Sequence, residues 1–322
     1  MRAIRVAAFG GIENLTLESN YPLPAVGKKE VLIKVSAAGV NPVETYIRSG
    51  MFALLPELPY TPGSDAAGVV QEVGSEVTRF KKGDRVCTVR TLTGSYAEYT
   101  TAEDKFVVHL SDKLSFAQGA AIGIPYYTAV KALQIRAKAR SGERCLIHGA
   151  SGAVGIAAIQ FAKAMGLHVI GTAGTKEGMA LVKNTGADLV FNHREDGYVK
   201  AIQDAIGGVD IILEMASHVN LQRDLDLVNT RGRVVVIGCR GNIEINPTST
   251  MAKESCIMGV NLMEVTDEDF HEMHHVIRTG MEVGWLDPKV SKVYPLGEAK
   301  TAQHDVINNQ GTTGKLVLDT TK

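Results

Sequence analysis

Three glycines at regular spacing follow a short apolar run in the middle of the chain. Residues 145–148 have the composition of a buried strand, and Gly149, Gly152 and Gly155 follow directly in a G-x-x-G-x-x-G pattern. Such a loop lets a pyrophosphate approach bare backbone at the positive end of the next helix. Because a helix is predicted to follow at 154–165, the pattern indicates a dinucleotide site. A tight turn that serves packing alone is the alternative.

The residues after the next two predicted strands indicate which nicotinamide cofactor is expected. NAD-binding proteins usually place an Asp or Glu there to hold the ribose 2′-hydroxyl. This chain has Gly174 and Lys176 after one strand, and His193 and Arg194 after the other. Basic groups in place of a carboxylate favour a 2′-phosphate, so we expect NADPH. In the alternative interpretation, Lys176 and Arg194 are only solvated charges at helix ends.

These residues belong to a segment in which strands and helices alternate. Strands are predicted at 145–148, 168–172, 189–191, 209–213 and 232–237, and helices at 154–165, 176–185 and 198–206. This alternation predicts a doubly wound parallel sheet, the Rossmann arrangement.

The flanking parts of the chain have a different pattern. Short β-rich runs separated by Gly and Pro predict a barrel-like antiparallel domain, with strands at 31–35, 68–73, 84–89 and 96–100. The apolar segment 115–132 predicts a buried helix that leads into the second domain. A polar helix at 267–280 and a strand at 315–318 are expected to return to the first domain.

Length and composition indicate the class of protein. A chain of 322 residues favours two domains, and 21% charged with 45% apolar residues is typical of a globular protein. Lys and Arg number 34 against 35 Asp and Glu, which offers nucleic acid no excess charge. The four cysteines lie far apart and do not predict a disulfide framework or a zinc lobe. Lacking a signal peptide or membrane span, the chain is expected in the cytosol.

Blocks of sequence along almost the whole chain resemble one known family. They are AGVNPVETYIRSG at 38–50, PYTPGSD at 59–65, GDRV at 83–86, HGASG at 148–152, GTAGT at 171–175 and FNHRE at 191–195. The chain resembles the zeta-crystallin family of NADPH:quinone reductases, a zinc-free branch of the medium-chain dehydrogenase/reductase superfamily. The resemblance implies a GroES-like β-barrel catalytic domain (1–117 and 264–322) and a Rossmann NADP-binding domain (118–263), with the active site between them. It also implies a cytoplasmic homotetramer.

Position by position, the resemblance also implies a set of cofactor contacts. With Lys176 from the reasoning above, they are Tyr46, Thr128, Ser151, Gly152, Ala153, Val154, Gly174, His193, Asn220, Ile237, Gly238, Cys239, Arg240, Val260, Asn261 and Leu262. Two departures from the family pattern stand out. Ala153 replaces a second consecutive glycine, and Phe52 replaces a tyrosine in the substrate pocket, which keeps an aromatic wall but loses a hydroxyl.

The same comparison predicts a site without metal. Zinc-dependent members of the superfamily carry cysteine at the position of Asn41 and His-Glu at Ser64 and Asp65, and Asn and Ser are poor zinc ligands. The scattered histidines His109, His148 and His193 are expected to be structural.

Without a Lewis acid the acceptor must be electrophilic in itself, as a quinone is. Tyr46 is the expected hydrogen-bond donor to the developing oxyanion, with Asn41 as the alternative and Phe52 beside the substrate. A packing role for Tyr46 stays open.

Two other functions remain possible at this point. An NADPH-dependent 2-alkenal or enone reductase would need the same glycine loop and the same metal-free site, and only the acceptor profile separates it from a quinone reductase. Relatives in the resembled family also serve as lens structural proteins or bind AU-rich messenger RNA. The neutral net charge weighs against RNA binding as the primary role.

Overall fold

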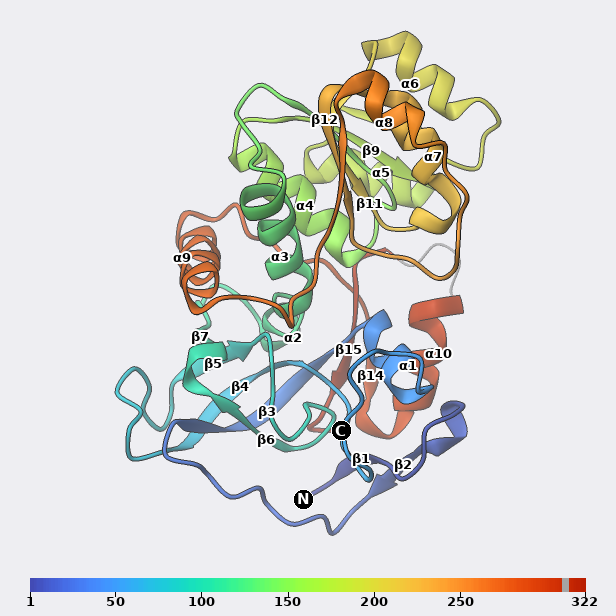
Figure 1. Cartoon of the computed structure of the whole chain (residues 1–322). Helices are drawn as coiled ribbons and strands as arrows, with labels where there is room; N and C mark the ends of the chain where they lie inside the picture. The colour runs from blue at the N-terminus through green and yellow to red at the C-terminus, as the bar shows by residue number, and fades with distance from the viewer. Residues whose placement is uncertain (309–312) are drawn as a thin grey trace. The chain divides into compact units, whose positions relative to one another are not determined.

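The computed structural model describes residues 1–308 and 313–322, and these residues form two compact units (Figure 1). Unit 1 contains Met1–Ile124 and Pro288–Lys322, and unit 2 contains Pro125–Asp287. The strand expected at 315–318 lies in unit 1, whereas the helix expected at 267–280, which was also predicted to return to the first domain, lies in unit 2. The boundaries between the two units lie at 124/125 and 287/288, whereas boundaries at 117/118 and 263/264 were expected.

The position of helix α9 (Asp267–Val283) explains why the second boundary lies at 287/288 and not at 263/264. It packs against α3 (Gly123–Val130), where the rings of Tyr127 and Phe270 lie 5.5 Å apart and the Tyr127 hydroxyl bonds to His274 Nδ1. These contacts keep α9 in unit 2, although its polar sequence gives no sign of where it packs.

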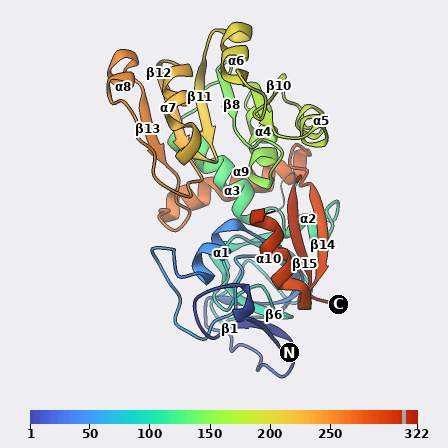
Figure 2. The ribbon, with the colours of Figure 1, turned by 90° about the vertical axis from the view of Figure 1, so that its right-hand side faces the viewer.

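Unit 1 is built on a mainly antiparallel sheet around the long strand β3 (Glu30–Val40), in which only the described pair β14 and β15 is parallel. Strand β3 pairs with β4 (Asp65–Val73), with β6 (Tyr99–Glu103) and with the C-terminal β15 (Lys315–Asp319). The other elements are β1 (Ala3–Val6), β2 (Leu15–Glu18), β5 (Arg85–Thr88), β7 (Val107–His109), β14 (Val290–Pro295), α1 (Pro42–Arg48), α2 (Phe116–Gly119) and α10 (Ala299–Asn308). Figure 2 shows β14, β15 and α10 together. Residues from both ends of the chain share one apolar core.

Unit 2 is a parallel sheet in the order β10-β9-β8-β11-β12-β13. Its strands are β8 (Arg144–Ile147), β9 (His168–Ala173), β10 (Leu189–Asn192), β11 (Val209–Glu214), β12 (Val228–Val236) and β13 (Cys256–Gly259). The further helices are α4 (Ala153–Ala164), α5 (Lys176–Thr185), α6 (Tyr198–Ile206), α7 (Ser217–Leu227) and α8 (Thr248–Lys253). The strand order runs outward in opposite directions from the central pair β8 and β11. In such sheets a ligand crevice opens at the carboxyl ends of that pair. The expected fold class is confirmed.

The single helix expected over 115–132 is wrong, because the segment is split into α2, α3 and a π-helix, η3 (Lys131–Arg136). Asp65 occupies the break between α2 and α3, where its Oδ1 accepts the Ile124 backbone N–H at 2.8 Å. A Cβ on Gly123 would lie 2.2 Å from that oxygen. The glycine is therefore required where α3 begins.

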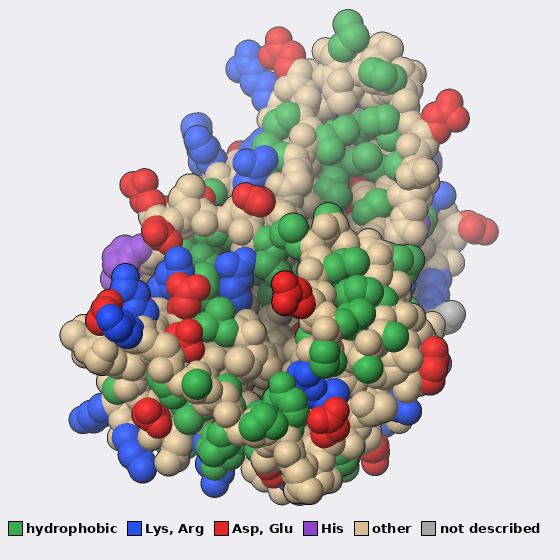
Figure 3. All heavy atoms as spheres, turned by 60° about the horizontal axis from the view of Figure 1, so that its bottom comes forward, with side chains coloured by type: hydrophobic (Ala, Val, Ile, Leu, Met, Phe, Trp, Pro, Cys, Tyr) green, Lys and Arg blue, Asp and Glu red, His purple; other side chains and the backbone are tan. Residues whose placement is uncertain are grey.

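The surface carries mixed charge. Figure 3 shows Lys and Arg side chains interspersed with Asp and Glu on the face that it presents. In the part of the chain that the structure describes, no helix combines the length and the apolar character needed to span a bilayer.

Candidate functional site

The glycine loop joins β8 to α4 at the centre of the parallel sheet. Gly149 has a φ of +56°, and Gly152 is the N-cap of α4 without a side-chain cap. A Cβ on Gly155 would lie 2.5 Å from the Ala150 Cα, so only glycine allows the helix to pack this closely on the loop. The first turn of α4 contains no acidic residue. The backbone N–H groups at this helix end are thus available to an anion.

The end of β9 is where the sequence predicted the 2′-phosphate site. A Cβ on Gly174 would lie 2.7 Å from Arg194 Nε and 2.7 Å from His193 Nε2. Two basic side chains therefore lie against the backbone of this glycine. Desolvation, together with the charges of His148 and Arg194, lowers the pKa of His193. Lys176, at the start of α5, is exposed to solvent.

Other predicted cofactor residues follow strand ends at the same edge of this sheet. Asn220 lies in α7 after β11, and its amide contacts Tyr198 Oη and Glu214 Oε1, each at 3.4 Å. The segments 237–240 and 260–262 follow β12 and β13. Since the strands are parallel, their carboxyl ends form one edge, which gathers these residues with the glycine loop. Thr128 differs, because it is buried inside α3.

The loop after β12 approaches the end of β11 closely. A Cβ on Gly238 would lie 2.2 Å from the Met215 carbonyl oxygen, so this position requires glycine. Cys239 is exposed, and its thiol donates to the Gly241 carbonyl oxygen at 3.0 Å. The hydrogen bond with the Ser217 side chain is the main cause that lowers the pKa of Cys239.

In unit 1, Asn41 is fully engaged by buried neighbours. Its Nδ2 donates to Glu44 Oε1 at 3.1 Å and to Asp65 Oδ2 at 2.9 Å, and its Oδ1 accepts a hydrogen bond from Lys315 Nζ. The residue is 2% exposed. Both amide hydrogens are therefore used inside the protein, which leaves none for a substrate.

A buried ammonium group completes this network. Lys315 Nζ lies 2.9 Å from Asp65 Oδ2, and both side chains are almost fully buried. The Tyr96 hydroxyl donates to Glu44 Oε2 at 2.5 Å. Burial raises the pKa of Glu44, and the charge of Lys315 opposes that rise. The network around Asn41 and Asp65 thus contains its own cation, a feature that the sequence alone did not reveal.

The remaining predicted residues of unit 1 are Tyr46 and Phe52. Tyr46 is half-buried in α1, and its carbonyl oxygen accepts the Met51 N–H at 2.9 Å. Phe52 is half-buried in the segment that follows α1, where Met51 and Leu54 are 75% and 62% exposed. The ring of Phe52 is therefore part of an exposed apolar stretch.

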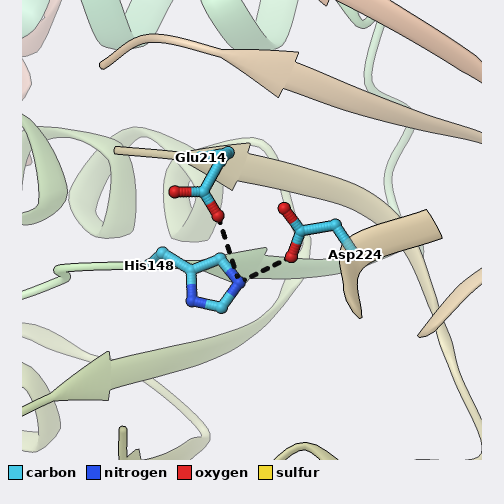
Figure 4. A group of neighbouring side chains, drawn as sticks. All are labelled: His148, Glu214 and Asp224. Carbon is cyan, nitrogen blue, oxygen red and sulfur yellow. Dashed lines mark hydrogen bonds and ion pairs between the residues drawn. The ribbon is translucent and has the colours of Figure 1, made fainter. Parts of the chain in front are cut away.

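The structure brings together three residues of unit 2 that the sequence did not predict to be neighbours. His148, expected to be structural, lies with its Nε2 2.9 Å from Asp224 Oδ1 and 3.5 Å from Glu214 Oε2 (Figure 4). All three side chains are buried. The sequence signal that could have revealed the group is a carboxylate, Glu214, directly after the apolar run 211–213 of β11.

Comparison with known proteins adds to this geometry. Residues 27–112 match the profile described as the alcohol dehydrogenase GroES-like domain, and residues 153–279 match that of the zinc-binding dehydrogenases. The chain is 53% identical to the human quinone oxidoreductase over 320 residues, covering 99% of this chain and 97% of that one. The chain belongs to the quinone oxidoreductase family. The family includes the quinone oxidoreductase of Sus scrofa, 54% identical over the same shares of both chains.

Solved structures confirm the fold of this family member. A crystal structure of Escherichia coli quinone oxidoreductase complexed with NADPH has a TM-score of 0.88 and 28% identity, and covers 99% of this chain and 100% of that chain. An NAD-dependent alcohol dehydrogenase has a TM-score of 0.91 and 26% identity, with 99% of both chains covered. The two neighbours differ in the cofactor or activity that they are named for, so specificity has to be argued from individual residues.

Proposed function

We propose that the chain is an NADPH:quinone oxidoreductase that works without a metal. The observation that carries this proposal is Gly174, against which His193 and Arg194 lie at the edge that holds the glycine loop. A carboxylate there would repel a 2′-phosphate, whereas two basic side chains attract it. Relatives named quinone oxidoreductase at 52–54% identity over nearly the full length support the quinone as acceptor.

The residues present fit the dinucleotide in detail. A Cβ on Gly155 would collide with the loop, and a Cβ on Gly174 would collide with the two basic side chains. The start of α4 has no side-chain cap and therefore suits a pyrophosphate. NADPH, when bound, supplies a hydride. The N–H groups at the start of α4 would hold the phosphates, and the residues around Gly174 would orient the ribose that carries the 2′-phosphate. Segments 237–240 and 260–262 would contact the rest of the cofactor.

On the acceptor side we assign the donor role to Tyr46. Asn41 has both amide hydrogens engaged by Glu44 and Asp65, so the alternative donor is not free. The Tyr46 phenol would donate a hydrogen bond to the oxygen that gains negative charge. Phe52 supplies an apolar surface without a donor. A quinone needs only this modest assistance, because its reduced form is aromatic.

The proposed absence of a catalytic metal rests on the Asn41 network. Lys315 already places a positive charge between Asn41 and Asp65, and neither Asn41 nor Ser64 is a good zinc ligand. We expect full activity after exhaustive chelation of the purified protein. Stoichiometric zinc, with activity lost on its removal, would contradict this part of the proposal.

An acceptor panel tests the reaction. Consumption of NADPH is followed with quinones, 2-alkenals and simple alcohols or ketones under identical conditions. We expect quinones to be turned over fastest and unactivated ketones not to be reduced. Faster turnover of 2-alkenals than of any quinone would favour an enone reductase instead.

We also propose that the protein is a homo-oligomer of the cytoplasm. Strand β13 ends the parallel sheet, and Ile257 on it is 37% exposed, which suits pairing with a second copy of the chain. The four cysteines are free thiols, as is usual in a reducing compartment. Light scattering of the purified protein tests the oligomeric state, for which a tetramer is expected. The mixed surface charge does not favour RNA as a main partner.

A further inference from the structure

The group formed by His148, Glu214 and Asp224, here named the acid–histidine cluster, is buried beneath the glycine loop. His148 ends the β8 side of the loop, Glu214 ends β11, and Asp224 lies in α7. Their ligand atoms lie within 4.8 Å of one another, and the exposed fractions of the three side chains are at most 5% (Figure 4). Within the described residues, Glu214 Oε2 and Asp224 Oδ2 receive no hydrogen bond. One oxygen of each buried carboxylate therefore lacks a hydrogen-bond donor, which is costly unless a proton is present.

The acid–histidine cluster touches two parts of the proposed cofactor site. His148 Nδ1 lies 3.4 Å from Thr172 Oγ1, and the same hydroxyl accepts the Gly149 N–H at 3.3 Å. On the other side, Glu214 Oε1 accepts the Ala216 N–H and lies 3.4 Å from Asn220 Nδ2. The cluster thus supports both the first glycine of the loop and the orientation of Asn220.

The charge of the cluster depends on pH in the neutral range. Burial raises the pKa of Glu214 to about 7 and that of Asp224 to about 7. Burial lowers the pKa of His148, although the charge of Glu214 opposes this. The other charged or titratable groups that face the cluster are Arg223, which lowers the pKa of Asp224, together with Tyr198 and His193. With a neutral imidazole and both carboxyls ionised, the cluster would carry two buried negative charges.

We propose that the acid–histidine cluster takes up a proton when NADPH binds and, in that protonated form, positions the glycine loop and Asn220 for the cofactor. This inference rests on the proposed function. The proton moves from buffer to a carboxyl oxygen of Glu214 or Asp224, and no bond of the cofactor changes. A phosphate-bearing anion next to the loop favours the less negative cluster, so binding and protonation stabilise each other.

Loss of the proton from the cluster should weaken NADPH binding. The carboxyl pKa values are raised, so the cluster is protonated below about pH 7 and loses its proton above it. NADPH affinity should therefore fall as pH rises from 6 to 8, by roughly threefold to tenfold for an average uptake of about a quarter to half a proton over that range. The 2′-phosphate of the cofactor, with a second pKa near 6, contributes a separate pH dependence.

The experiment measures NADPH binding by calorimetry at pH 7 in PIPES and in Tris, two phosphate-free buffers that differ in ionisation enthalpy, and the dissociation constant from pH 6 to 8. We expect net proton uptake on NADPH binding in the wild type. In Asp224→Asn we expect no proton uptake by the cluster and no contribution of the cluster to the pH dependence of the dissociation constant. Glu214→Gln is the second variant, and the melting temperature of each is recorded at every pH. Asp204→Asn, an exposed acid on α6 with the same change of charge, is the matched control and should behave as the wild type.

Further controls distinguish proton uptake by the cluster from proton exchange at the 2′-phosphate or at His193, and distinguish failure of this inference from failure of the proposed function. NADH, which lacks the 2′-phosphate, should show the same loss of affinity with pH. His193→Asn should keep the proton uptake that Asp224→Asn removes. Wild-type binding without proton uptake, or uptake unchanged in both cluster variants, would overturn this inference alone. Failure of NADPH to bind at any pH would overturn the proposed function. A stoichiometric divalent ion in the wild type that is absent from Asp224→Asn would show that the cluster binds a metal rather than a proton, and would also overturn the inference.

Discussion

Gly174 shows how the absence of one side chain gives room to two others. His193 Nε2 and Arg194 Nε each lie 2.7 Å from the position that a Cβ of residue 174 would take, and both atoms belong to flexible side chains. A longer residue can therefore be accommodated if these side chains move. The position thus lends itself to a test of cofactor choice that leaves the fold intact.

Replacing Gly174 by Asp should weaken NADPH binding more than tenfold, since the carboxylate repels the 2′-phosphate and attracts its basic partners. Binding of NADH should be retained or improved, because a carboxylate can accept from a 2′-hydroxyl. Dissociation constants from nicotinamide fluorescence give the comparison, and NADH binding serves as the control for folding. Equal losses for both cofactors would mean that the site had been damaged rather than re-specified.

Tyr46 allows a second test at the scale of a residue. Tyr46→Phe removes one hydroxyl and keeps the ring, so turnover with a quinone should fall about tenfold, less than the hundredfold typical of an oxyanion donor. Tyr46→Ala should also raise the Michaelis constant by removing the ring. Turnover, NADPH affinity and melting temperature are measured for both variants. Wild-type turnover in Tyr46→Phe beside an impaired Tyr46→Ala would reduce the residue to a packing role.

At the scale of secondary structure elements, a lysine on the last strand is central to unit 1. Lys315 begins β15 and bonds to Asn41 and Asp65, which lie 274 and 250 residues earlier in the chain. The ion pair therefore joins the C-terminal strand to the start of α1 and to β4. Removing one partner leaves a buried charge unpaired.

Lys315→Met should lower the free energy of unfolding by about 3 kcal/mol, the lower end of the range for breaking a buried pair. Chemical denaturation with a fluorescence readout measures the change. Lys292→Met, on neighbouring β14, removes a solvent-exposed charge and should change stability by less than about 1 kcal/mol. Similar effects of the two substitutions would show that the buried pair is not a major contribution.

Sequence periodicity predicted β8 to β12 and helices α4, α5 and α6 of unit 2, because parallel strands buried on both faces are continuous apolar runs separated by amphipathic helices. Helices α7 and α8 and strand β13 were not predicted. Helix α6 matches its expected bounds, and β8 to β12 all occur near their expected positions. Strands β1 and β14 were missed, since four to six residues without strict alternation give little signal. The break at Gly123 was missed because its cause is Asp65, a distant residue.

The candidate site was predictable to the extent that its residues are local. The glycine loop and Gly174 belong to short motifs with a physical reason for each glycine. The acid–histidine cluster and the Asn41 network could not be predicted in this way. His148 and Asp224 lie 76 residues apart, and only the strand order of the sheet brings β8 and β11 together.

At the scale of the whole molecule, the chain combines a mainly antiparallel unit that contains Tyr46 with a parallel unit that contains the proposed dinucleotide site. Proteins with nearly the same fold include one named for NAD-dependent alcohol oxidation and one named for quinone oxidoreduction. Fold similarity therefore leaves the reaction undecided, and Gly174 with the Asn41 network carries the distinction. The decisive evidence has to come from the reaction of the intact protein.

The most direct test is the rate of nicotinamide oxidation by the full-length protein after exhaustive chelation, with one quinone and either NADPH or NADH. The absorbance of the reduced nicotinamide is followed, and kcat/KM is compared for the two cofactors. We predict quinone reduction with NADPH preferred by at least about tenfold, a difference of about 1.4 kcal/mol in transition-state stabilisation. Absence of quinone reduction together with zinc-dependent oxidation of an alcohol by NAD would contradict it.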